Sequence, residues 1–276
     1  MQTFSERAVK DFKAAGFSHV RIRVKDPLSK KLLSQLDEQV RLCEQHSLIP
    51  VLAYQAGDFK KDPTRQNMND VVRWWKIVAE YFTDATPMLS FDLLIEATEA
   101  VNKEPQKLNL LYEESVAAIR ETNPQRIIFI SPRMRSDPAY LHELKIPSRH
   151  NNRLMAEWHF YASGPSKVNE SKMWTTGTPE EKRIILDKIR TAKEWEKQTG
   201  IPTWIGAWMP GSYNDGNDYP INEQVAFARF VASELDKAKI PFAVNSDSKF
   251  YDRARQSWIP SMRPVLAAIL SPEGKR

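Results

Sequence analysis

The segment Leu89–Glu96 reads Leu-Ser-Phe-Asp-Leu-Leu-Ile-Glu. A short, mostly apolar run of this kind predicts a buried strand, and we expect Glu96 to lie at its carboxyl end. Similar β-branched or aromatic runs recur roughly every 30–50 residues, with longer amphipathic stretches between them, which is the spacing of a strand followed by a helix. The sequence therefore predicts an α/β fold built from successive βα units.

Seven strands can be recognised in this way. They are His19–Val24, Ile49–Tyr54, Leu89–Glu96, Arg126–Ser131, Leu154–Tyr161, Thr203–Trp208 and Phe242–Asp247. The amphipathic stretches, predicted as helices, include Lys30–His46, Asn67–Phe82, Lys107–Thr122, Pro179–Thr199 and Asn222–Lys237.

A closed barrel of eight βα units, the (β/α)8 or TIM-barrel type, suits a chain of this length. We expect this fold, with its first strand either absent from the chain or not recognised. No linker or low-complexity segment divides the sequence, so we expect a single domain over residues 1–276.

Composition excludes several classes of function. The formal net charge is +5, from 40 basic and 35 acidic residues that are mixed along the chain, so a nucleic-acid partner is not expected. No run of about 18 apolar residues predicts a membrane span. The single cysteine, Cys43, lies in an apolar-periodic segment and is expected to be a buried core residue. The opening residues do not resemble a signal peptide.

Alternation along the strands groups polar residues on shared faces, and such residues are costly in a core unless they pair or serve a site. The groups are Asp92 with Leu94 and Glu96, Glu157 with His159 and Tyr161, and His19 with Arg21 and Arg23. Active sites of such barrels lie at the carboxyl ends of the strands. Glu96, Tyr161, Ala207 and Asn245 are all expected there.

Three further segments carry a resemblance to a known family. They are Ala14–Ile22 (AAGFSHVRI), Glu157–Tyr161 (EWHFY) and Pro202–Trp208 (PTWIGAW). Together with Leu89–Glu96 they resemble glycoside hydrolase family 5, which includes the endoglucanases. The resemblance implies a retaining β-glycoside hydrolase of the cellulase type, most simply a β-1,4-glucanase, that is secreted or periplasmic and binds an oligo- or polysaccharide without a cofactor or metal.

The resemblance also implies roles for individual residues. Glu96 matches the catalytic acid/base, and Arg21 matches the arginine that keeps the nucleophile ionised. His159 and Tyr161 match a His-x-Tyr pair beside the catalytic groups. Ala207 stands where the family has its nucleophilic glutamate. Either a glutamate was replaced by design, or the natural protein has lost it; the sequence leaves both open.

Other positions depart from the family pattern. Ile95 replaces an asparagine that precedes the acid/base, Tyr54 and Gln55 stand near a usual histidine, and Asn245 lies where a tryptophan often ends the last strand. Apart from those already given roles, the expected substrate contacts are Tyr54, Gln55, Trp158, Trp208 and Asn245. Trp74, Trp75 and Trp195 are expected in the core.

Three alternatives to an impaired retaining hydrolase stay open. Glu157 or Asp247 would be the candidate base for an inverting reaction, which needs a more distant second carboxylate. The chain would otherwise be a non-catalytic carbohydrate-binding protein, or a scaffold without affinity for sugar.

Overall fold

The computed structural model describes residues 4–148, 153–159, 174, 176–211, 213, 219–245 and 247–271. The chain clusters into two compact units. The first contains Met1–Val9 and Ser18–Trp158, and the second contains Lys10–Phe17 and His159–Arg276. The boundaries between the units fall inside helix α1 (Glu6–Ala15) and near the end of strand β5 (Leu154–His159).

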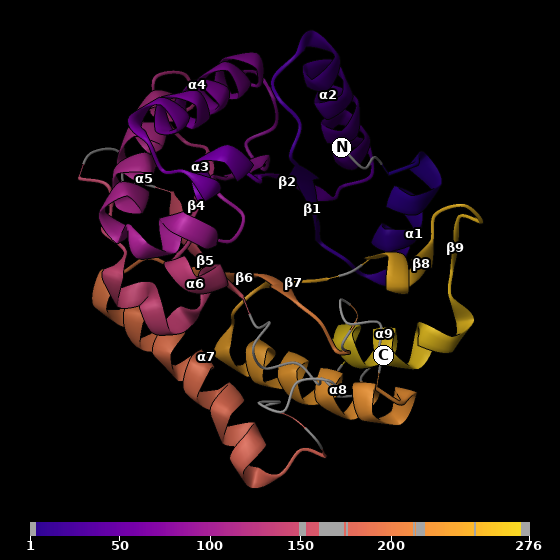
Figure 1. Ribbon diagram of the computed structural model, residues 1–276. Helices are drawn as coiled ribbons and strands as arrows, with labels where there is room; N and C mark the ends of the chain where they lie inside the picture. Colours follow the sequence, from indigo (N-terminus) through magenta and orange to yellow (C-terminus); the bar gives the residue numbers. More distant parts are fainter. Residues whose placement is uncertain are drawn as a thin grey trace. The chain divides into compact units, whose positions relative to one another are not determined.

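The first unit is built on parallel strands that pair in chain order (Figure 1). Besides β5 these are β1 (His19–Val24), β2 (Ile49–Tyr54), β3 (Ser90–Asp92) and β4 (Ile127–Ile130). In this register Arg21 lies opposite Val51, and Ala53 lies opposite Asp92. Paired residues of parallel strands point to the same face, and Val51 and Ala53, two positions apart on β2, also share a face. Arg21 and Asp92 therefore lie on one face of the sheet.

Helices connect these strands. They are α2 (Lys30–Gln45), α3 (Gly57–Lys61), α4 (Arg65–Tyr81), the 3₁₀ helix η1 (Glu99–Lys103), α5 (Pro105–Arg120), the short turn α6 (Arg133–Ser136) and the 3₁₀ helix η2 (Pro138–Glu143). The side chains of Ser29 and Thr64 cap α2 and α4 by accepting from backbone N–H groups, as N-cap residues do. Helices α4 and α5 lie side by side (Figure 1).

Aromatic rings join α4 to the sheet in the first unit. Trp75 packs on Phe91 of β3, with ring centroids 5.2 Å apart. Trp74 stacks on Tyr54 of β2 at 4.1 Å. Both tryptophans are buried, as predicted for core residues. The apolar positions of α4 therefore fix the helix against the outer face of β2 and β3.

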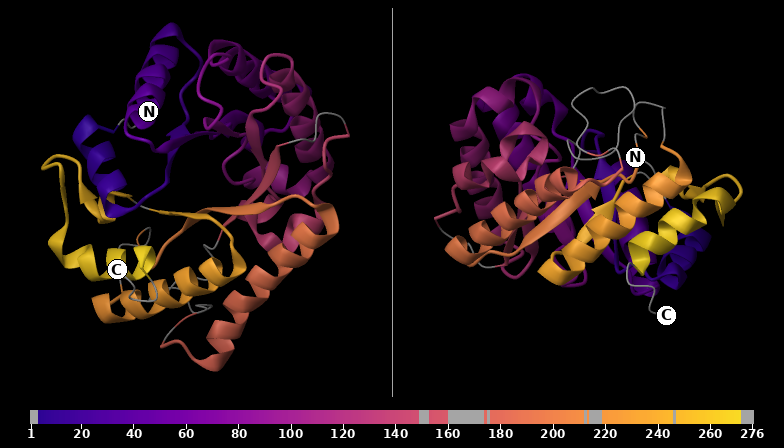
Figure 2. Two further views of the ribbon diagram at one scale, coloured as in Figure 1. Left: turned by 180° about the vertical axis from the view of Figure 1, so that it is seen from behind. Right: turned by 90° about the horizontal axis from the view of Figure 1, so that it is seen from below.

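The described part of the second unit contains two parallel strands, two long helices and a shorter helix near its end. Its elements are α7 (Pro179–Thr199), β6 (Thr203–Trp208), α8 (Ile221–Ala238), β7 (Phe242–Val244), η4 (Asp247–Lys249), β8 (Tyr251–Asp252), β9 (Ser257–Trp258), η5 (Pro260–Met262) and α9 (Arg263–Leu270). A capping box of Thr178 and Glu181 starts α7, and Gly200 ends it in a left-handed conformation. Helices α8 and α9 run side by side (Figure 2).

The hairpin of β8 and β9 holds the second half of α1 within this unit. The Tyr251 hydroxyl donates to the Asp11 carboxylate at 2.8 Å. The ring of Phe12 contacts the rings of Tyr251 and Trp258 at 5.2 and 5.6 Å. This aromatic cluster lies between segments almost 240 residues apart in sequence.

The predicted elements are confirmed in order and type, but several strands are shorter than expected. The strand predicted over Leu89–Glu96 ends at Asp92, and the one predicted over Phe242–Asp247 ends at Val244, with Asp247 starting a 3₁₀ turn. Leu94 and Glu96 therefore do not continue the strand face of Asp92, because side chains rather than a neighbouring strand bind the carbonyls that follow β3. Tyr161, predicted at the end of β5, lies outside the described residues.

Cys43 is buried, as predicted, and burial raises the pKa of its thiol to about 12. Among the helices in the described ranges, none combines the length and the apolarity needed to cross a bilayer.

Arg126, directly before β4, is a buried cross-link whose loss we expect to be costly. Its guanidinium donates to the carbonyls of Phe82 and Leu89 and to the side chain of Asn123. Arg126→Met should lower the free energy of unfolding by roughly 3 kcal/mol, because several buried acceptors lose their donor. Urea unfolding checks this, with the exposed Arg73 on α4 as the control: Arg73→Met should change stability little, and equal effects would contradict the prediction.

Candidate functional site

Each of the three backbone carbonyls that precede Glu96 accepts a hydrogen bond from a side chain. Trp75 Nε1 of α4 donates to the Leu93 carbonyl at 3.0 Å. Ser131 Oγ, directly after β4, donates to the Leu94 carbonyl at 3.1 Å. Lys60 Nζ of α3 donates to the Ile95 carbonyl at 3.0 Å. Because buried carbonyls are costly to leave unbound, these bonds fix the path of the chain beyond β3.

Backbone hydrogen bonds to the neighbouring strands also hold the segment before Glu96 in place. The Leu93 N–H donates to the Phe129 carbonyl of β4 at 3.2 Å, and the Ile95 N–H donates to the Tyr54 carbonyl of β2 at 2.9 Å. Glu96 then adopts φ of 55°, a left-handed conformation that is uncommon for a residue with a side chain. The conformation turns the chain away from the strand direction, and such strain gathers at functional sites.

Cations surround the Glu96 carboxylate. Its side chain is 15% exposed, and Oε2 lies 3.9 Å from Nη1 of Arg135. Lys60 is 3% exposed, and the Glu96 charge is the largest charge acting on it. Burial nevertheless dominates and lowers the pKa of Lys60 to about 8.

Arg21 forms a buried ionic network on the inner face of the same sheet. Its guanidinium binds the Asp92 carboxylate and lies 2.7 Å from Oε1 of Glu157. Both carboxylates are completely buried. Glu157 thus pairs with Arg21 of β1. Glu157 is thereby held as a partner of Arg21, which does not favour the alternative role of a base in an inverting reaction.

The predicted substrate contacts on β2 divide between two faces. Gln55 Oε1 accepts from Arg23 Nε at 2.9 Å, which places Gln55 with the arginines of β1. The Tyr54 ring instead stacks on Trp74 of α4. Burial raises the pKa of the Tyr54 hydroxyl, and the nearby Asp58 and Asp70 raise it further. Gln55 thus lies on the face of Arg21, whereas the ring of Tyr54 belongs to the helix layer.

The two tryptophans expected at the substrate are both buried. Trp208, the last residue of β6, packs against Phe227 of α8 and Phe242 of β7, with centroids 6.1 and 5.7 Å apart. Trp158 is fully buried one position after Glu157, so it points to the opposite face of β5. A sugar stacks on an exposed ring face, so this packing does not favour the predicted contacts of Trp158 and Trp208 with substrate.

The remaining predicted residues lie in the second unit. Ala207 is the second-last residue of β6, faces away from Trp208, and is 5% exposed. Asn245 directly follows β7, and its N–H donates to the Trp208 carbonyl at 2.8 Å. His159 is buried at the end of β5. Their contacts with a ligand stay predictions. Within the described residues no cluster of three or more histidine, cysteine or carboxylate side chains could hold a metal.

Sequence reasoning missed Lys60 and Arg135. Lys60 lies in the five-residue helix α3, and nothing in the local sequence distinguishes it from the exposed Lys61 beside it. Arg135 lies in a loop nearly 40 residues after Glu96. Only the packing of β2, β3 and β4 brings both side chains to one carboxylate.

Comparisons with known proteins cover almost the whole chain. The model of the family described as Cellulase (glycosyl hydrolase family 5) matches residues 2–245. Endoglucanase H of Acetivibrio thermocellus is 22% identical over 95% of this chain, which spans only 30% of that protein's length.

Solved structures give the fold. The cellulose synthase subunit Z of Clostridioides difficile superposes with a TM-score of 0.85 at 23% identity, covering 98% of this chain and 93% of that one. Endoglucanase Cel5A of Thermotoga maritima gives 0.84 at 21% identity, covering 96% and 90%. The predicted (β/α)-barrel fold class is thereby confirmed, with seven parallel strands in the described residues.

The buried network of Arg21 gives a stability prediction. Arg21→Met should lower the free energy of unfolding by about 3–5 kcal/mol at neutral pH, because two buried carboxylates lose their cation. The loss should shrink in acid, where protonated carboxyls need no counter-charge. Chemical denaturation at pH 7 and pH 4 measures both effects. Arg23→Met, on the same strand face but exposed, is the matched control, and a similar loss there would contradict the prediction.

Lys60 gives a prediction about pH. Its pKa is lowered from 10.5 to about 8, so between these values the unfolded chain binds more protons at this site than the folded chain. The contribution of Lys60 to stability is therefore complete above pH 10.5 and is lost as the pH falls through about 8.

Replacing Lys60 by methionine removes this titration. The stability of Lys60→Met relative to the wild type should fall on the order of 2 kcal/mol between pH 7 and pH 10. Denaturation curves at the two pH values test this, with the exposed Lys61→Met as control. Parallel behaviour of both variants and the wild type would show that Lys60 does not titrate as described.

Proposed function

Because the chain belongs to the cellulase family, glycosyl hydrolase family 5, we propose that its site is that of a retaining β-glycoside hydrolase acting on β-1,4-glucan, with the nucleophile replaced by Ala207. The observation that supports this most is Glu96, a half-buried carboxylate held by a fully bonded backbone segment after β3. A preorganised carboxylate of this kind is what a catalytic acid/base requires.

The proposed chemistry assigns each residue one task. Retaining glycosidases use two carboxyl groups about 5–5.5 Å apart, of which one protonates the leaving oxygen and the other attacks the anomeric carbon. Glu96 would be the proton donor to the leaving oxygen. The methyl group of Ala207 has no lone pair with which to attack. The chain as it stands is therefore inactive or strongly impaired in glycoside hydrolysis.

The substrate class is supported by related proteins. The Thermotoga maritima Cel5A has been solved with cellobiose and with mannotriose, and a hyperthermophilic endo-β-1,4-glucanase of the same fold has been solved with its substrate. These proteins are 21–22% identical to the present chain. We propose that the present chain likewise binds a β-1,4-linked oligosaccharide.

Ala207 also favours a second candidate, a non-catalytic carbohydrate-binding protein on the same fold. Ile95 supports it, because an apolar side chain replaces the amide expected next to the acid/base. Binding needs the shape of the site and its hydrogen bonds, and it does not need a nucleophile. The two candidates differ in one property, which is whether a carboxylate at position 207 restores turnover.

We expect Ala207→Glu to cleave a cello-oligosaccharide at least about 10³-fold faster than the native chain, since loss of a catalytic group costs several orders of magnitude. Release of reducing sugar measures this. In the Ala207→Glu background, Glu96→Gln should return the rate to that of the native chain, whereas Glu104→Gln, in the loop before α5, should not.

A second readout uses the native chain itself. With an activated aryl glycoside, azide at Ala207 should attack in place of the missing carboxylate and give a glycosyl azide of inverted configuration. If Ala207→Glu stays silent while calorimetry shows that the native chain binds cellotetraose, the binding-protein candidate holds. Neither cleavage nor binding would refute both candidates.

A further inference from the structure

The turn α6, Arg133–Ser136, contains three successive non-glycine residues in the left-handed region. Met134, Arg135 and Ser136 have φ of 58°, 59° and 59°. Each such residue costs roughly 1–2 kcal/mol relative to a right-handed conformation. The turn persists only because its surroundings compensate for this cost.

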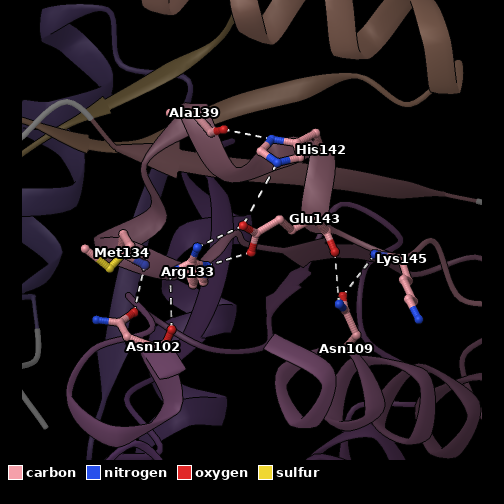
Figure 3. A network of polar contacts seen from close by, with 8 residues as sticks. All are labelled: Asn102, Asn109, Arg133, Met134, Ala139, His142, Glu143 and Lys145. Atoms are coloured by element: carbon pink, nitrogen blue, oxygen red, sulfur yellow. Dashed lines mark hydrogen bonds and ion pairs between the residues drawn. The ribbon is translucent and has the colours of Figure 1, made fainter. Parts of the chain in front are cut away.

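A polar clamp holds the turn (Figure 3). Arg133 binds Glu143 of η2 through two hydrogen bonds, Nε to Oε2 at 2.6 Å and Nη2 to Oε1 at 2.8 Å. The Met134 N–H donates to the side chain of Asn102 at 2.8 Å, and Arg133 Nη1 donates to the Asn102 carbonyl at 3.3 Å.

The clamp extends beyond the turn on both sides. Asn109 of α5 donates to the Glu143 carbonyl at 3.0 Å and accepts from the Lys145 N–H at 2.9 Å (Figure 3). The guanidinium of Arg133 also lies 4.1 Å from the ring centroid of Tyr140. Bidentate pairs of this kind fix orientation as well as distance. Arg133 and Met134 are thus fastened to η1 and η2, and η2 is in turn bonded to α5.

The clamped turn presents Arg135 to Glu96. The Arg135 N–H donates to the Ala97 carbonyl at 2.9 Å, which ties the turn to the segment that carries Glu96. The Arg135 side chain is 68% exposed. Among the described residues, its guanidinium forms an ion-pair contact with Glu96, with Nη1 lying 3.9 Å from Oε2. That distance exceeds a hydrogen bond, so the donors of the guanidinium are available to a ligand.

Arg135 is one of several charged groups close to Lys60 and Glu96. The charged groups acting on Lys60 are Glu96, Glu99, Arg23 and Arg135. Lys60 is bonded to the Ile95 carbonyl and Arg23 to Gln55. Arg135 is the cation of this group that combines high exposure with an ion-pair contact to Glu96, and a guanidinium matches the two oxygens of a carboxylate.

We propose that Arg135 is a specificity-determining residue that binds a carboxylate on the saccharide at Glu96. The inference rests on the proposed function and narrows its substrate class to glucan chains carrying acidic groups. A rigid turn suits this role, because a side chain held in place loses less conformational entropy when it binds. The clamp residues Arg133, Asn102 and Glu143 position the turn without touching the ligand.

Calorimetric titration of the native chain tests the proposal with two probes, cellotetraose and a cellotetraose oxidised to carboxylates at C6. The oxidised probe should bind about 3- to 10-fold more tightly at low salt, the range of a charge-assisted contact at an exposed site. The preference should shrink at high ionic strength, because salt screens exposed charges.

Variants assign the preference to Arg135. Arg135→Gln should abolish it, so that this variant binds the two probes with equal affinity. Arg135→Lys should keep part of it, because the charge remains and the planar fork is lost. Arg73→Gln, which removes an equally exposed arginine from the outer surface of α4, should leave it unchanged. Asn102→Ala, checked for folding by circular dichroism, should weaken it by loosening the clamp.

Two results would overturn the inference while leaving the proposed function intact. One is equal affinity of the native chain for both probes, and the other is a preference that survives in Arg135→Gln. Failure to bind either probe would instead remove the proposed function, and this inference with it.

Discussion

Three consecutive carbonyls, those of Leu93, Leu94 and Ile95, determine how the region beyond β3 is built. Each is bound by a side chain from a different element: Trp75 of α4, Ser131 after β4 and Lys60 of α3. The strand ladder has ended by this point, so without these donors the carbonyls would be buried unbound. Because these donors come from α4, from the residue after β4 and from α3, the backbone position of Glu96 depends on how those elements pack around β3.

The same arrangement explains why a lysine is buried beside Glu96. Burial disfavours the ammonium group and lowers its pKa to about 8, yet the Ile95 carbonyl and the Glu96 charge retain it there. From the other side, the left-handed turn at Arg135 adds a second, exposed cation. One carboxylate is thus framed by a buried cation that fixes its backbone and an exposed one that is open to ligand.

Arg21 illustrates a different use of charge in the same sheet. Its two buried carboxylate partners, Asp92 and Glu157, come from β3 and β5, so the ionic network links strands that are not neighbours in the sheet. Breaking such a network is expensive because a buried charge is left without compensation. Arg21 therefore has a structural role in this chain whatever occupies position 207.

The side chains of Trp158 and Trp208, buried toward the helix layer, likewise stabilise the fold.

The sequence by itself determined the order of strands and helices, the core roles of Trp74 and Trp75, and the family, because hydrophobic periodicity and short motifs are local properties of a chain. It also predicted Glu96 and Ala207 as the positions where the chemistry is decided. It could not give the early end of β3, the burial of Lys60 or the clamp under Arg135. Those depend on hydrogen bonds between residues about 10 to 40 positions apart, and only the tertiary structure decides which donor reaches which acceptor.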